Sequence, residues 1–184
     1  NNKGYFFENS YFQSRNIPIH LSKSYTFSFW IKMKSYKDGM AIMELANPDD
    51  SDTSNIPCNL NPQIWQYQES MYLTTASNIY NSIHIMSLQR IKAGVEIPTW
   101  NHVLWTVKND TTSLYVNGIL KETKIMPWPK VETVNLTLAN AGNKCPGDLG
   151  VSNYHNQPSS VHVDEVRVYN RVLSLTEIQN LSKN

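Results

Sequence analysis

The stretch "VHVDEVRVYNRVLSLTEIQNL" occupies residues 161–181 and contains two successive structural signals. Its first half alternates apolar and polar side chains, the pattern of a half-buried β-strand. The alternation shifts at the adjacent acidic residues Asp164 and Glu165, because Val161 and Val163 precede them at odd positions whereas the next two valines have even numbers. A one-residue β-bulge at the acid pair would return all these valines to one face. The sequence therefore predicts a strand with a bulge at Asp164 and Glu165.

A short helix is predicted directly after this strand. Ser174 and Glu177 have the S-x-x-E spacing of a capping box, in which each side chain hydrogen-bonds a backbone N–H at the helix start. Leu175, Ile178 and Leu181 follow at intervals of three residues. We expect these three side chains to form one apolar face that covers the rest of the domain.

Period-two patterns dominate the remainder of the chain. Asn117-Gly118 lies between two strand-like runs and predicts a two-residue hairpin turn, because these residues tolerate positive φ. The main alternating or strand-like segments are 25–33, 82–88, 102–109, 113–123, 133–140, 148–153 and 160–169. Roughly 11 to 13 short strands with polar turns and one helix predict an all-β fold, an antiparallel β-sandwich of the jelly-roll type.

The bulk composition excludes several classes of function. The chain has 184 residues, the size of one domain, and we expect residues 1–184 to form it. It begins at Asn1 rather than Met, so we expect it to be part of a larger multidomain protein. The net charge is +1, without the basic stripe typical of nucleic-acid binding. No apolar run approaches the length of a membrane span, which argues against membrane insertion.

Three segments resemble the laminin-G-like and concanavalin-A-like jelly-roll domains. They are "YTFSFWIKMKS" (25–35), "WNHVLWTVKNDTTSLYVNGILKET" (100–123) and "VHVDEVRVYNRVLSLTEIQNL" (161–181). The resemblance spans nearly the whole chain and implies the same sandwich, with Trp30, Trp100 and Trp105 packed in its core. That superfamily includes adhesion modules, pentraxins, lectins, glycosidase-appended modules and the receptor-side jelly roll of clostridial neurotoxins. Fold does not decide among these functions.

The acid pair Asp164 and Glu165 is a candidate catalytic site. Some concanavalin-like glycosidases carry carboxylates at alternate strand positions, so that both point into one cleft. Asp164 and Glu165 are adjacent and would normally point to opposite faces, and no other acidic residue lies in the strand. We therefore expect a structural role, in which the carboxylates accept hydrogen bonds at the bulge or pair with Arg167 or Arg171. The sequence predicts that the domain is not an enzyme.

A calcium site is one interpretation of the loop "NPDDSD". Clustered carboxylates at Asp49, Asp50 and Asp52 are the hard oxygen ligands that Ca²⁺ prefers. Asp148 is a possible fourth ligand, and the resemblance favours Ca²⁺ because related domains bind it at the sandwich rim. The alternative is a solvated acidic loop without metal.

The two cysteines, Cys58 and Cys145, both lie in turn-rich segments. A disulfide between them would close a long loop and would be worth about 4 to 5 kcal/mol in the chain-entropy model. It would also imply an oxidising compartment. The alternative is two unrelated free thiols.

Exposed aromatic side chains are candidate ligand contacts. Trp65 and Tyr67 share one face of a predicted strand, and Trp128 lies between two prolines outside any strand pattern. Sugars stack on aromatic rings, whereas core packing is the usual alternative for tryptophan.

Together these features predict a non-catalytic recognition or adhesion module, extracellular or on a cell surface. It would bind a glycan or a protein receptor through its loops, with Ca²⁺ as an optional cofactor. The alternatives are a structural or assembly domain that contacts neighbouring domains of its own protein, and a module appended to a glycosidase.

Overall fold

The computed structural model describes residues 5–8, 12–19, 23–35, 41–46, 63–67, 70–77, 87–125, 132–138 and 160–183. This part of the chain forms twelve strands and one short helix. The strands are β1 (Tyr5–Glu8), β2 (Phe12–Ile17), β3 (Tyr25–Met33), β4 (Ala41–Ala46), β5 (Gln63–Tyr67), β6 (Ser70–Ser77), β7 (Ser87–Lys92), β8 (Trp100–Lys108), β9 (Thr111–Val116), β10 (Ile119–Ile125), β11 (Val134–Leu138) and β12 (Ser160–Tyr169), and the helix is α1 (Leu175–Leu181).

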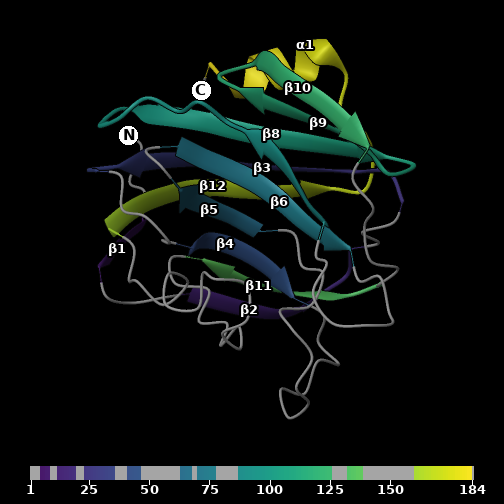
Figure 1. Ribbon diagram of the computed structural model, residues 1–184, viewed down its shortest axis with the longest axis horizontal. Coiled ribbons are helices and arrows are strands. Elements are labelled where there is room, and N and C mark those ends of the chain that lie inside the picture. Colours follow the sequence, from purple (N-terminus) through teal and green to yellow (C-terminus); the bar gives the residue numbers. More distant parts are fainter. Residues whose placement is uncertain are drawn as a thin grey trace.

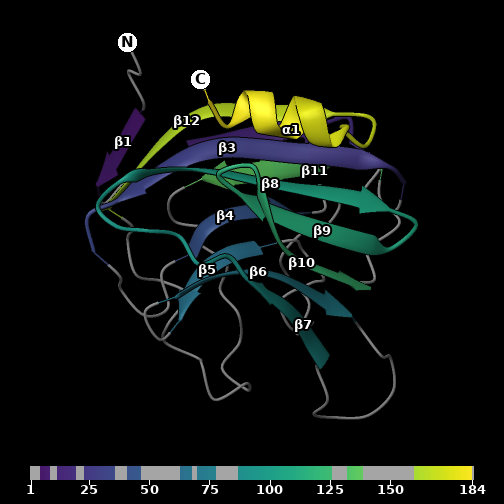
Figure 2. The same ribbon diagram turned by 90° about the horizontal axis from the view of Figure 1, so that it is seen from above.

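The strands form two antiparallel sheets stacked face to face, with α1 on the outer side of one of them (Figures 1 and 2). The first sheet has the order β1-β12-β3-β8-β9-β10, and the second has the order β2-β11-β4-β5-β6-β7. Consecutive strands repeatedly switch between the sheets, as in a jelly roll. The predicted all-β sandwich with a C-terminal helix is therefore confirmed.

The core lies between the sheets and takes one side chain in two from each central strand. Phe27, Phe29 and Ile31 of β3 are buried, and they lie opposite Trp105 and its neighbours on β8. The indole of Trp105 stacks on the ring of Phe27, with centroids 4.7 Å apart. The alternating residues of β3 and β8 point instead to the outer face of the first sheet.

Two-residue turns connect β8, β9 and β10 into a meander. Asn117 and Gly118 have φ of 52° and 75°, the left-handed values that a tight hairpin turn requires. Asn109 and Asp110 form the preceding turn, with φ of 48° and 63°. The Asn117-Gly118 turn lies where the sequence predicts it.

The predicted bulge is present in β12. Asp164 pairs with Trp30 and Arg167 pairs with Ser28, so the β12 segment contains one more residue than the β3 segment opposite it. Glu165 has a φ of 49°, which marks it as the irregular residue of the bulge. Because of this extra residue, the valines on both sides of the acid pair face the sandwich interior.

The helix caps the outer face of the first sheet, although its apolar face differs from the predicted one. Ile178 and Leu173 are buried together against Leu104, and Leu181 packs beside them. Leu175 is 56% exposed, so its predicted place in this face was wrong. Leu173 precedes the N-cap and Ile178 is the fourth helical residue, which is the arrangement of a hydrophobic staple.

Some predicted strands lie partly or wholly outside the described residues. A strand predicted over 82–88 is described only from Ser87, where β7 begins, and the segment 148–153 lies outside the described residues. In the described part of the chain, no helix has the length and apolar character needed to cross a membrane.

Candidate functional site

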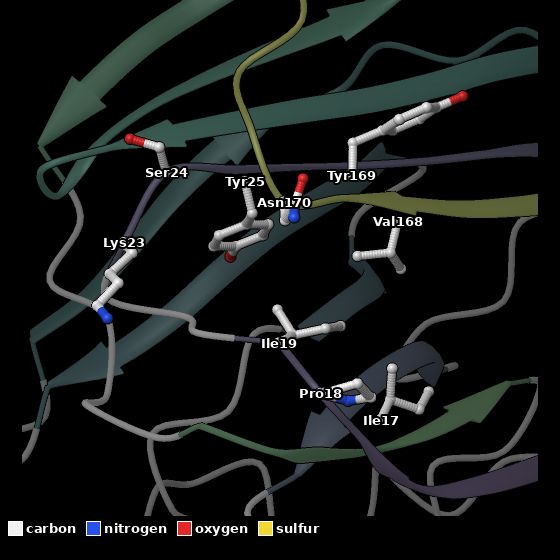
Figure 3. A pocket seen from close by; sticks show the side chains of 9 residues that line it. All are labelled: Ile17, Pro18, Ile19, Lys23, Ser24, Tyr25, Val168, Tyr169 and Asn170. Atoms are coloured by element: carbon white, nitrogen blue, oxygen red, sulfur yellow. The ribbon is translucent and has the colours of Figure 1, made fainter.

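A cavity of about 630 Å³ opens at one rim of the sandwich (Figure 3). It lies where the chain passes from the end of β2 in the second sheet to the start of β3 in the first, beside the end of β12. It is lined by Ile17, Pro18, Ile19, Lys23, Ser24, Tyr25, Val168, Tyr169 and Asn170. Its volume is in the range of small-ligand pockets.

The cavity has apolar walls and a few polar groups. In Figure 3, the side chains of Ile19, Tyr25 and Val168 converge, whereas those of Ser24 and Tyr169 point away from them. Val168 is on the inner face of β12, yet it is 37% exposed because it lines the cavity. An apolar group can enter such a space, while Lys23 provides a cation beside it.

Tyr25 is the most constrained of the lining residues. Its side chain is buried, and its hydroxyl accepts a hydrogen bond of 3.5 Å from the indole Nε1 of Trp105. Burial raises the pKa of Tyr25, so the phenol is neutral at physiological pH. The tyrosine therefore contributes a neutral wall to the cavity rather than an ionisable group.

Sequence reasoning missed this cavity. One signal was the apolar run Ile17-Pro18-Ile19, which begins at the last residue of β2. The second signal was Val168, the last inward-facing valine after the bulge. Neither signal indicates a cavity until the two sheets are placed relative to each other.

The outer face of the first sheet holds a second group of aromatic side chains, and here two core assignments were wrong. Trp105 is fully buried in the core, as expected. Trp30 and Trp100 are only partly buried and alternate with the core positions of β3 and β8. Trp30 packs beside His102 with ring centroids 5.2 Å apart, and Trp100 packs beside His162 at 6.0 Å.

His102 is unusual because its side chain is buried without a partner for Nδ1. Only 2% of its surface is exposed. Burial, together with the positive charge of Arg167, lowers the pKa of His102 to about 4. The imidazole is therefore neutral near pH 7.

The acid pair is engaged in the bulge. Asp164 Oδ1 accepts the backbone N–H of Glu165 at 2.8 Å, and Glu165 Oε2 pairs with Arg167 Nη2 at 2.9 Å. Arg171 instead pairs with Glu177, at 2.6 and 3.0 Å. These contacts are the kind expected of a structural acid pair.

The capping box is also present. Ser174 Oγ accepts the N–H of Glu177 at 3.4 Å, and Glu177 Oε2 accepts the N–H of Ser174 at 2.8 Å. The hydrogen bonds from Arg171 and Ser174 lower the pKa of Glu177 to about 2. The predicted capping box is therefore confirmed.

Several predicted site residues are outside the described part of the chain. These are Asp49, Asp50, Asp52, Cys58, Trp128, Cys145 and Asp148. Trp65 and Tyr67 lie in β5, for which the structure describes the backbone at these two positions. The calcium site, the disulfide and the loop contacts thus stay predictions.

Within the described ranges, no group of three or more His, Cys, Asp and Glu residues is arranged to hold a metal ion.

A sequence comparison identifies the family. The Laminin_G_3 model, described as the concanavalin A-like lectin/glucanases superfamily, matches residues 6–179. No curated protein sequence is significantly similar to the chain.

Solved structures share the fold at low identity. The binding domain of botulinum neurotoxin serotype G has a TM-score of 0.61 and 15% identity over 96% of this chain and 40% of its own. Domain 4 of AbnA, an extracellular arabinanase from Geobacillus stearothermophilus solved with arabinotriose, has a TM-score of 0.60 and 17% identity, with coverages of 91% and 71%. The binding domain of botulinum neurotoxin DC, solved with rat synaptotagmin II, has a TM-score of 0.58 and 15% identity, with coverages of 88% and 36%. This chain therefore spans about 40% of the length of the serotype G binding domain.

Proposed function

Because the chain belongs to the laminin-G-type domains of the concanavalin A-like lectin/glucanases superfamily, we propose that it is a non-catalytic recognition module that binds a glycan or a protein receptor. The observation that carries the proposal is the rim cavity between Ile17 and Val168. It combines apolar walls with a lysine and polar groups, which is the usual construction of a binding pocket. We place the module outside the cell or on its surface.

The similar structures support recognition in this sandwich. Domain 4 of AbnA was solved with an oligosaccharide, and the binding domain of botulinum neurotoxin DC was solved with a protein receptor. At these identities the likeness concerns the fold, and the ligand of this chain depends on its own side chains.

The contacts of the acid pair argue against glycoside hydrolysis. A retaining or inverting glycosidase needs two carboxyl groups on opposite sides of the scissile bond. Asp164 accepts a hydrogen bond inside the bulge and Glu165 pairs with Arg167. These contacts give both carboxylates structural partners.

A module appended to a glycosidase is the second candidate. The observation that favours it is the likeness to domain 4 of AbnA, which is one domain of an extracellular arabinanase. In that case the module would bind a polysaccharide and hold an enzyme domain close to it.

The test is a glycan array probed with the domain, with and without EDTA, together with a pull-down of candidate surface proteins. Filling the cavity by Val168→Trp should abolish or strongly weaken binding, and Lys23→Glu should weaken it. The matched control is Lys121→Glu on the edge strand β10, which should bind normally. Loss of binding in EDTA would in addition support the predicted Ca²⁺ site. Binding that is unchanged in Val168→Trp would contradict the role of the cavity.

A further inference from the structure

Beside α1, the outer face of the first sheet contains a cluster that the rim cavity does not involve. We call it the aromatic patch, and it consists of Trp30, Lys32, Trp100, His102 and His162. These positions lie on β3, β8 and β12, next to the part of the face that α1 covers.

The patch is arranged around Lys32. Lys32 pairs with His162 of β12 on one side and with Trp100 of β8 on the other. Strands two positions apart in a sheet are separated by about 9.6 Å. The rings of Trp100 and His162 are nevertheless 6.0 Å apart, so they lean toward each other across Lys32.

The patch also borders two buried polar atoms without a hydrogen-bond partner. They are Nδ1 of His102 and Oγ of Ser28, which are the two such side-chain atoms in the described part of the chain. Ser28 precedes Trp30 by two residues on β3, and His102 is directly opposite Trp30 on β8. Both atoms therefore belong to the same side of the sheet as the partly exposed indoles.

Cationic side chains lie near the two histidines of the patch. Besides burial, the charges of Lys32 and Lys34 lower the pKa of His162, and the charge of Arg167 lowers that of His102. Among the described acidic side chains, Asp164 accepts a hydrogen bond inside the bulge and Glu165 pairs with Arg167. An anion bound beside Lys32 would therefore be stabilised.

We propose that the aromatic patch is a binding site for an acidic saccharide, an inference that rests on the proposed recognition function and adds a second site to the rim cavity. The C–H groups of a sugar ring would pack on the indoles of Trp30 and Trp100, whose faces are electron-rich. A carboxylate or sulfate of the same sugar would pair with Lys32. Saccharide hydroxyls both donate and accept hydrogen bonds, and so match the partly exposed imidazole of His162.

The first measurement is affinity for acidic oligosaccharides and their neutral parents: sialyllactose against lactose, and 6-sulfo-N-acetyllactosamine against N-acetyllactosamine. We expect at least one acidic saccharide to bind at least about tenfold more tightly than its neutral parent. A hydrogen bond to a charged group changes an affinity by about this factor. Lys32→Gln, Trp30→Ala and Trp100→Ala should each reduce this affinity at least about fivefold. The control Lys108→Gln, at the far end of β8, should leave it unchanged.

A second readout separates binding from folding. The pKa of His162, followed by NMR, should rise when the acidic saccharide binds, because the bound anion offsets the charge of Lys32. Inorganic sulfate and vesicles with anionic phospholipid serve as the other arms. If inorganic sulfate or the anionic vesicles bind as tightly as the acidic saccharide, the assignment to a sugar would be overturned.

The remaining outcomes are distinct. Glycan binding that persists in the three patch variants would overturn this inference and leave the proposed recognition function intact. No binding of any glycan would overturn the inference and leave only a protein receptor for the module. Absence of both glycan and protein ligands would contradict the recognition function itself.

Discussion

Asp164 holds the backbone of Glu165 in place through a 2.8 Å hydrogen bond from the Glu165 N–H to Asp164 Oδ1. That N–H belongs to a residue with φ of 49°, a backbone conformation that residues other than glycine adopt at a cost in free energy. The acid pair thus stabilises the bulge that aligns both halves of β12 with the core.

This relationship predicts the effect of mutations at the bulge. Asp164→Ala should lower the free energy of unfolding by about 1 kcal/mol, because the Glu165 N–H loses its acceptor. Glu165→Val should lower it more, since a branched side chain tolerates positive φ poorly. Urea titration followed by tryptophan fluorescence measures both. Glu165→Gly is the control and should be no less stable than the Val variant; the reverse order would refute the strained bulge.

The capping box makes a separate contribution to stability. Ser174→Ala should destabilise the domain by about 1 kcal/mol, because the N–H of Glu177 loses its acceptor at the helix start. Thr176→Ala changes an exposed residue in the same turn and serves as the matched control. Similar unfolding midpoints for the two variants would show that the cap is unimportant.

The buried imidazole predicts a dependence of stability on pH. The folded pKa of His102, about 4, is below the ordinary value of 6.5, so the unfolded chain binds a proton that the folded chain rejects. Stability should therefore be full above pH 6.5 and fall as the pH drops toward 4, by about 3 kcal/mol. Calorimetry across this range should show the fall in the wild type and a shallower one in His102→Phe. Parallel curves for the two proteins would argue against a neutral buried His102.

The turn at Gly118 approaches the end of α1 closely. A Cβ added at Gly118 would lie 2.6 Å from Ser182 Oγ, and the φ of 75° strains any other residue. Gly118→Ala should therefore destabilise the domain by about 1 to 3 kcal/mol. Ser182→Gly in the same chain should recover the steric part only. A double-mutant cycle with zero coupling would show that the hairpin and helix do not touch in solution.

Alternation and turn chemistry were enough to predict most of the fold. The parity shift at Asp164, the Asn117-Gly118 pair and the Ser174–Glu177 spacing are local signals, and each one corresponds to a local feature of the structure. Trp30 and Trp100 were misplaced because the resemblance, rather than their own parity on the strand, was used to assign them.

The binding surfaces were harder to predict because they depend on long-range geometry. The cavity beside Val168 is lined by residues of both sheets, and the contact of Trp100 with His162 joins residues from strands two positions apart. Leu175 has the same chemistry as Leu173, and which of them is buried depends on the angle at which the chain enters the helix.

The central claim is that the domain recognises its ligand without cleaving a glycan. The most direct measurement is a comparison of the wild type with Asp164→Asn/Glu165→Gln, in which binding to an array-identified oligosaccharide and release of reducing ends are followed together. We predict the same affinity for both proteins, after allowance for their stability, and no release of reducing ends by either. Hydrolysis by the wild type that disappears in a correctly folded variant would contradict the claim.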